Sequence, residues 1–461
     1  MKKILLILLA TTLVLLMLAG CVTKEANYTD EVEDKSPMEV YLLGGERLDS
    51  LIARDYSVAY NYTHQRPIKT TTFADAETMY DQIMIEMYAG GGPDIILING
   101  ASSQYLNLSK LSDQNAFADM DILIEKSESF DLNEYNTQAM DTGVINGKRI
   151  MLPMEYSVNY CVGIEECFDH HEIEVPEKLT MDSYLSTIED YHKKNSNAPA
   201  LLGIDEEYLL SEFYKEGEKL EKSDELRRLL DILKTEHERI VEFGLRDVSR
   251  SEWPYAFIDA HDYMYNNRFL YIGAVGQRED VYFRMFHLQY NTIKNYWERE
   301  ALWFPQPFRE GKPVEAYVEY GFAINNNSSH KNEAFNFVEY SLSKLKQTTA
   351  NTIHFPVRKD SMDERKQEFS RGLNISYCDP WGVGAYGVHP DLIPDENVPE
   401  EMTEDFATYV DSAEEYRYIG HFKYVYYSIM KPSIEDYYRG YMSFDALIDE
   451  INNKLEIYYS E

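Results

Sequence analysis

The chain has 461 residues, 44% of them hydrophobic, and a formal net charge of −36. This composition is typical of a globular protein and excludes a disordered, collagen-like or multi-span membrane protein. Because a strongly negative surface repels phosphate groups, we expect no nucleic-acid partner and no electrostatic adhesion to an anionic membrane. At roughly 100–200 residues per domain, the length predicts two or three domains.

The N-terminal residues have the pattern of a secretory signal. A basic head, Met1–Lys3, precedes an apolar run, Ile4–Leu18, and small residues follow it. A signal anchor or a single membrane-spanning helix is the alternative, because Ile4–Val22 approaches the ~20 residues that a span needs. Leu18-Ala19-Gly20-Cys21 resembles a bacterial lipobox, which implies that residues 1–20 are removed and that Cys21 carries diacylglycerol. Residues 21–36 are polar, without an apolar period, and are interpreted as a flexible tether.

The first part of the body alternates strands and helices. Apolar and β-branched runs predict strands over Met38–Leu43, Ile68–Phe73 and Ile95–Ile98. Between them we expect a helix over Glu46–Tyr60 and a second helix that is capped by Asp75. Strand, helix, strand, helix, strand is the signature of an α/β fold.

Further along the chain, the pattern predicts more helices than strands. We expect a hairpin and strand over 145–153 and strands over 160–164 and 315–325. Spacing of apolar residues predicts short helices within 106–130, and further helices over 179–195 (with Thr180 as a possible cap), 206–243 (as two amphipathic helices), 331–345, 405–427 and 444–459.

The sequence contains motifs that resemble cofactor or metal sites, but the residues around them do not fit such sites. Gly382–Gly387 is formally G-x-G-x-x-G, but no strand precedes it and no helix follows, so it does not predict a dinucleotide site. His170-His171-Glu172 is interpreted as a surface segment, because the side chains of adjacent residues diverge. If Cys21 is acylated, three cysteines remain (Cys161, Cys167 and Cys378), which permits at most one disulfide. We therefore expect no catalytic residue, no metal and no cofactor.

Several segments together resemble the extracellular solute-binding proteins of ABC transporters, of the maltose-binding type. They follow one another in the same order as in that family: Ala89–Ile96, Asn146–Pro153, Phe304–Pro307 with Gly321–Ile324, Asn332–Val338 and Phe355–Asp360. Departures occur at Arg149-Ile150-Met151, which replaces the usual aromatic pattern, at Tyr160–Ile164, which lacks Tyr-Asn-Lys, and after Pro176, where the family's Trp is absent.

The resemblance implies an α/β, two-lobe periplasmic-binding-protein-like fold with a hinge and an interlobe ligand cleft. Lobe 1 would comprise residues 37–152 and 314–350, and lobe 2 residues 153–313 and 351–461. The crossings would lie near Leu152-Pro153 and between Phe304 and Pro313. The partners implied are a small-molecule solute and the transmembrane subunits of an ABC permease, for a monomer lipid-anchored at the cell membrane on its extracellular or periplasmic side.

Candidate ligand-binding residues follow from position. Ligands of α/β sheets bind beyond the carboxyl ends of strands. That rule selects residues after the first and third strands and beside the two crossings. The Gly-rich loop around Gly382–Gly387 adds two aromatic rings that can stack on a sugar. The candidates are Glu46, Asn99, Glu155, Tyr156, Trp303, Tyr320, Trp381 and Tyr386.

The predicted function is a membrane-anchored receptor that captures a small polar solute, most simply a carbohydrate, and delivers it to an ABC importer. A non-sugar solute, such as a peptide or another metabolite, remains open. A surface-anchored hydrolase is the alternative from a different class, and it would need a convergent acid–base pair that no motif here displays.

Overall fold

The computed structural model describes residues 36–44, 49, 52–100, 105–195, 199–202, 206–242, 271–272, 301–305, 308, 311–349, 355–370 and 400–460. The signal-like segment, the tether with Cys21, and the Gly-rich loop with Trp381 and Tyr386 lie outside these residues. Among the described residues, no helix combines the length and apolarity needed to cross a bilayer.

The molecule has two halves in space, each with its own sheet. A seven-stranded mixed sheet forms the centre of the first half, which holds the N-terminal strand together with later parts of the chain. Its order is β12-β6-β11-β3-β1-β2, and β13 also pairs with β11. β1 is parallel to β2 and β3, whereas β11 is antiparallel to β3 and β6. The strands are β1 (Met38–Leu43), β2 (Ile68–Phe73), β3 (Ile95–Asn99), β6 (Leu152–Val158), β11 (Val314–Ile324), β12 (Phe355–Pro356) and β13 (Ala413–Tyr418).

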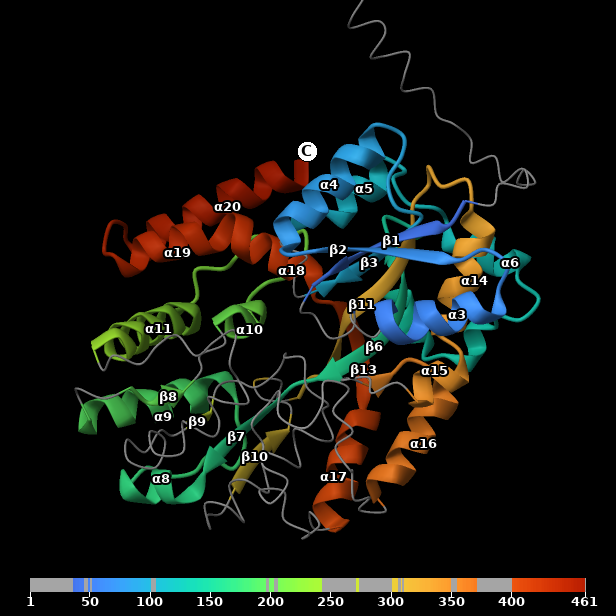
Figure 1. Cartoon of the computed structure of the whole chain (residues 1–461). Coiled ribbons are helices and arrows are strands. Elements are labelled where there is room, and N and C mark those ends of the chain that lie inside the picture. The colour runs from blue at the N-terminus through green and yellow to red at the C-terminus, as the bar shows by residue number, and fades with distance from the viewer. Residues whose placement is uncertain are drawn as a thin grey trace, which may run out of the picture.

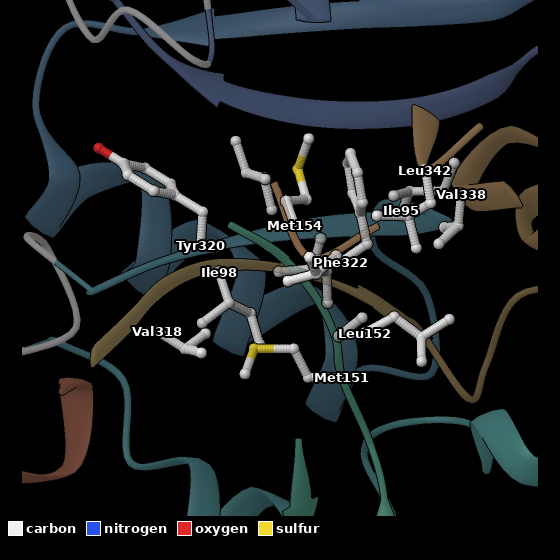
Figure 2. Close-up of a cluster of buried hydrophobic side chains, with 14 of the residues drawn as sticks. Ile95, Ile98, Met151, Leu152, Met154, Val318, Tyr320, Phe322, Val338 and Leu342 are labelled. Atoms are coloured by element: carbon white, nitrogen blue, oxygen red, sulfur yellow. The ribbon is translucent and has the colours of Figure 1, made fainter. Parts of the chain in front are cut away.

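The first sheet is coated by helices, and the apolar side chains between the layers form the first core. Figure 2 shows part of it: the side chains of Phe322 and Met154 lie on one face of the sheet, and those of Ile98 and Met151 lie on the other. The helical segments of this half are η1 (Ile52–Tyr56), α3 (Ser57–Thr63), α4 (Ala76–Tyr88), α5 (Leu108–Asp113), α6 (Met120–Lys126), η3 (Leu132–Glu134), α7 (Thr137–Asp141), α14 (Lys331–Ser341), α15 (Lys344–Thr349), α16 (Lys359–Ser370) and α17 (Glu400–Asp411).

A second, smaller sheet lies in the other half. Its order is β10-β7-β9-β8, with β7 (Tyr160–Ile164), β8 (Leu201–Leu202), β9 (Tyr271–Ile272) and β10 (Ala301–Pro305). The helical segments here are α8 (Glu165–His170), α9 (Met181–Lys194), α10 (Glu206–Ser211), α11 (Asp224–Glu242), α18 (Gly420–Val425), η6 (Tyr426–Met430), α19 (Lys431–Tyr438) and α20 (Phe444–Ser460). Their apolar faces form a second, separate core. In Figure 1 these helices gather on the left, opposite α3 and α14–α16.

The chain passes between the two halves at least three times. β6 continues through Asn159 into β7, β10 returns to β11, and β13 leads through Ile419 into α18. The first passage therefore lies beyond the predicted crossing at Leu152-Pro153, because all of β6 belongs to the first sheet. Phe355, Val357 and Tyr409 pack in the first core, although the sequence-based division placed residues 351–461 in lobe 2. The exact lobe boundaries stay a prediction.

Most local signals identified the elements correctly. The Asp75 carboxylate caps α4 by accepting a bond from the Thr78 N–H at 2.8 Å, and Thr180 forms a capping box with Ser183 at the start of α9. The hairpin of β4 (Val144–Ile145) and β5 (Lys148–Arg149) turns at Asn146 and Gly147, both with positive φ. Two residues of this kind are what a tight hairpin turn requires.

Two predicted helices are corrected by the structure. The helix expected over 405–427 is wrong, because α17 ends at Asp411 and strand β13 follows before α18 begins. The sequence of β13 contains Glu and Arg and therefore suits a helix, but pairing with β11 overrides that local preference. The helix expected over 331–345 ends at Ser341, where Leu342 and Ser343 separate α14 from α15.

Candidate functional site

Three of the candidate residues lie in one row across the first sheet. Tyr320 of β11 is paired with Asn99 of β3 on one side and with Glu155 of β6 on the other. Their exposed fractions are 1–2%, so all three are enclosed by protein. The structure thus brings these predicted residues together in the interior of the first sheet.

The row coincides with an irregularity in the sheet. The β11–β6 register shifts between Val318 and Tyr320, so that Glu319 is an extra residue opposite β6. Such a bulge bends a strand and increases its local twist. Glu319 is itself buried, and its main chain lies next to Gly100 at the end of β3. A second register shift follows between Tyr320 and Gly321, so the ladder between β11 and β6 is interrupted on both sides of Tyr320.

Tyr156 lies beside this row and contacts the strand that the sequence analysis missed. Its ring centroid is 5.3 Å from that of Tyr416 on β13 and 5.5 Å from that of Phe355 on β12. Burial raises the pKa of Tyr156 well above its ordinary value, and nearby Tyr416 adds to the effect. The Asn136 side-chain amide donates to the Tyr416 hydroxyl at 2.7 Å. Tyr156 is thus a packed, neutral ring in this arrangement.

The remaining candidates are not brought together in the part of the chain that the structure describes. Trp303 is placed by its backbone, which pairs with Val162 in the second sheet, and its side chain is not described. Glu46, Trp381 and Tyr386 lie outside the described residues. These four residues stay predictions.

A groove of about 1060 Å³ lies between the two halves. Parts of the first half line one side: the start of α5, the β4–β5 hairpin and strand β13. Parts of the second half line the other: the end of α10, the loop 212–223 and the start of α18. This volume is at the upper end of the ~300–1,000 Å³ of ordinary small-molecule sites.

Five aromatic residues line the groove together with many charged ones. The rings are Phe213, Tyr214, Tyr416, Tyr418 and Phe422. Tyr214 and Phe422 contact each other at 5.1 Å between centroids. Rings of this kind offer flat apolar faces, and the polar groups around them can fix a ligand's orientation.

Arg417 is the most constrained charge in the groove. Its guanidinium lies 3.0 Å from the Glu315 carboxylate and 3.3 Å from the Tyr317 hydroxyl, and it stacks over the Tyr317 ring at 5.1 Å. Burial alone would lower the pKa of Arg417, but its interactions with the Tyr317 hydroxyl and with the negative charge of Glu315 outweigh burial and raise the pKa. Arg417 therefore stays charged and holds β13 against β11.

His421 lines the groove at the start of α18, next to the Tyr418 ring. Burial lowers the pKa of His421, although the negative charge of Glu216 opposes this shift. The imidazole is therefore uncharged at neutral pH and can both donate and accept a hydrogen bond.

Metal binding has no support among the described residues, where no group of three or more His, Cys, Asp or Glu side chains could hold an ion. His170 and His171 lie edge to face, and the His171 ring packs on Tyr191 and contacts the Asn195 amide at 3.1 Å. The histidine pair is thus engaged in local packing.

Sequence reasoning missed the groove residues on β13 and in the loop 212–223. The residues of β13 favour a helix, so local preference did not predict a strand there. The charged residues of the loop 212–223 predict only that the loop is exposed to solvent. The Tyr-x-Tyr spacing of Tyr416 and Tyr418 was the one available clue, because alternation is typical of strands.

Two α/β halves with separate cores, joined by crossing strands and separated by a groove, define the two-lobe fold of periplasmic binding proteins. No family model matches the sequence, and no curated protein matches it. Solved structures do match, over nearly the whole chain.

One similar structure is the ABC substrate-binding protein Lmo0181 from Listeria monocytogenes in complex with cycloalternan, with a TM-score of 0.56 and 13% identity, covering 93% of this chain and 100% of that chain. Another is the sugar-binding protein MalE from Xanthomonas citri, with a TM-score of 0.59 and 14% identity, covering 91% and 96%. A third is maltose-bound MalE3 from T. maritima, with a TM-score of 0.56 and 12% identity, covering 92% and 99%. At these identities the likeness establishes the fold, and the predicted fold class is confirmed.

Proposed function

We propose that the protein is a solute-binding receptor that captures a carbohydrate between its two lobes and delivers it to an ABC importer. The observation that carries the proposal is the groove of about 1060 Å³, which is lined by residues from both halves. The structural neighbours named as sugar-binding proteins support the choice of ligand class. Acylated Cys21 would hold the receptor at the membrane, and the tether over residues 21–36 would let the lobes reach the permease.

Binding would act by a shift between open and closed arrangements of the lobes. A solute that contacts the loop 212–223 on one side and β13 on the other gains both sets of contacts only when the lobes are close. The bulge at Glu319 and the three chain passages provide the bending point. The closed form would then present a surface to the permease.

The groove offers complementary chemistry for a sugar. Rings such as Tyr416 and Phe213 can cover the C–H faces of a pyranose, and carboxylates such as Glu216 accept its hydroxyl protons. Trp303, Trp381, Tyr386 and Glu46 remain proposed contacts at the rim of the same interlobe space. Asn99, Glu155 and Tyr320 are buried, and we propose that they act at the hinge between the lobes.

No bond is made or broken in this function, so the proposal includes no catalytic residue. The alternative function, a hydrolase, differs in its outcome, because it would cleave the ligand that it binds and release a product. A peptide or another metabolite as the ligand would leave the two-lobe mechanism intact and change only the solute.

The test measures affinity, shape and turnover on the same preparation. Glycan, peptide and metabolite panels are screened by calorimetry, small-angle scattering is recorded with each binder, and product formation is followed by chromatography. We expect a glycan to bind, the radius of gyration to fall, and no product to appear. Binding without compaction, compaction with peptides alone, or turnover of the bound glycan would each contradict the proposal.

A matched pair of variants locates the site. Tyr416→Ala removes a groove ring, whereas Tyr62→Ala removes a ring on α3 that is 87% exposed and lies away from the groove. Truncation of an anchoring ring commonly costs about 2 kcal/mol or more in binding. Equal affinities of the two variants would show that the groove is not the binding site, and thermal unfolding controls for lost stability.

A further inference from the structure

The interlobe groove has an uneven balance of charge. Seven glutamates line it, against four lysine and arginine side chains. Five of the seven belong to the stretch that links α10 to α11 and to the first turn of α11: Glu212, Glu216, Glu218, Glu221 and Glu225. One side of the groove is therefore strongly acidic.

The basic side chains offset only part of this excess, because two of them pair with glutamates of the lining and a third pairs with a glutamate outside it. Arg417 is paired with Glu315 at 3.0 Å, and Lys219 is paired with Glu456 of α20 at 2.9 Å. Lys215 forms an ion pair with Glu218. Lys312 is exposed near the start of β11 and is the remaining basic residue of the lining.

A negative groove in a chain of net charge −36 acts on ligands of different charge in different ways. A cleft that is lined by one sign of charge concentrates the electric field, so an anion is repelled as it approaches. Inside the groove the anion also loses water without gaining a partner of opposite charge. Hydroxyl groups, in contrast, donate to carboxylates without charge repulsion. The same field attracts organic cations, so the exclusion that it predicts applies to anions.

We propose that the groove selects uncharged oligosaccharides and rejects acidic ones, such as uronate-containing or sulfated sugars. This inference rests on the proposed function and adds the charge class of the solute. The groove volume is large enough for a ligand of more than one sugar ring, since it matches the upper end of sites for drug-sized ligands.

The experiment uses an array that presents neutral, uronate-containing and sulfated oligosaccharides in matched sets, with galactotriose and trigalacturonate as soluble probes for calorimetry. We expect every bound glycan to be neutral, and its acidic counterpart to bind about tenfold or more weakly in low salt. Raising the salt concentration should narrow that ratio, because screening weakens repulsion. An acidic glycan that binds as well as its neutral counterpart would overturn the inference and leave the proposed function standing. Binding of amines alone, or of no glycan, would overturn both.

Variants test whether the groove carboxylates cause the discrimination. Glu216→Gln with Glu221→Gln removes two charges from the acidic side, and Glu128→Gln removes one from an exposed loop that does not line the groove. We expect the double variant to reduce the neutral-to-acidic affinity ratio at least about threefold at low salt, and Glu128→Gln to leave it unchanged. An equal ratio in all three proteins would contradict this assignment. If the double variant fails to fold, the salt dependence of the unmodified protein decides.

Discussion

Gly100 at the end of β3 lies directly against Ile419, the residue that joins β13 to α18. A Cβ atom on Gly100 would be 2.8 Å from Cγ2 of Ile419 and 2.9 Å from the Glu319 carbonyl oxygen. These distances are shorter than carbon contacts allow, so the passage between the halves requires glycine here. The contact joins a strand of the first sheet to a residue of the second core.

We therefore predict that Gly100→Ala lowers the free energy of unfolding by about 1–3 kcal/mol, the usual cost of overpacking. Gly91→Ala is the matched control, since its Cβ would meet only the Glu86 carbonyl oxygen at 3.8 Å. Urea unfolding of the two variants measures the difference. Equal midpoints would show that the contact at Gly100 relaxes without cost.

Arg149 is expected to stabilise the first lobe through two carboxylates. Its guanidinium contacts Asp121 at 2.7 Å and Asp141 at 2.8 Å, and it donates to the Met140 carbonyl. Hydrogen bonds to charged groups contribute about 1.5–3 kcal/mol, so Arg149→Met should cost about 2 kcal/mol. Arg149→Lys should recover only part of this loss, because an ammonium cannot hold both carboxylates in one plane. Full recovery by lysine in thermal unfolding would contradict the proposed geometry.

Asp49 should make stability depend on pH. Burial raises its pKa from the ordinary 3.8 to about 7, although its carboxylate accepts the Leu43 N–H. Between about pH 4 and pH 7 the folded state holds a proton that the unfolded state releases. The free energy of unfolding is therefore highest below about pH 4, as far as Asp49 determines it, and falls as the pH rises to about 7.

Asp49→Asn keeps an acceptor for Leu43 without the charge. We expect it to stabilise the protein at pH 8 by up to about 4 kcal/mol and to have a much smaller effect at pH 4. Melting temperatures of both proteins across this range provide the measurement. A variant that is equally destabilised at both pH values would show that the carboxylate is needed in its charged form.

Trp381 is predicted to anchor the ligand. Truncating such a ring commonly costs about 2 kcal/mol or more, so Trp381→Ala should weaken glycan binding at least about tenfold. Unchanged affinity with a large fall in melting temperature would identify Trp381 as a core residue instead.

Cys21 is predicted to be the lipidated N-terminus. Mass spectrometry of membrane-extracted protein should find residues 1–20 missing and a diacylglyceryl mass added. Cys21→Ala should move the protein to the soluble fraction, and retention in the membrane fraction would count against the prediction.

Local signals were sufficient for much of the fold. Strands β1 and β2 match their predicted bounds, and the caps at Asp75 and Thr180 place α4 and α9. These features depend on neighbours in the sequence, and therefore sequence patterns reveal them.

Contacts between distant segments account for what was missed. Strand β13 exists because Arg417 and its neighbours pair with Tyr317 and the start of β11, about a hundred residues earlier in the chain. The site was only partly predictable for the same reason. The rule about strand ends found Asn99, but the groove is formed by Tyr416 and Glu216, which only the tertiary arrangement brings together.

Strand β11 belongs to both halves of the molecule. Val318, Tyr320 and Phe322 pack in the first core, whereas Tyr317 packs in the second. Loss of this strand would remove the ladder partners of β3, β6 and β13 together with an aromatic member of the other core. Neither half can therefore melt while the other keeps its full set of contacts. Unfolding of one half is therefore coupled energetically to the other through this strand.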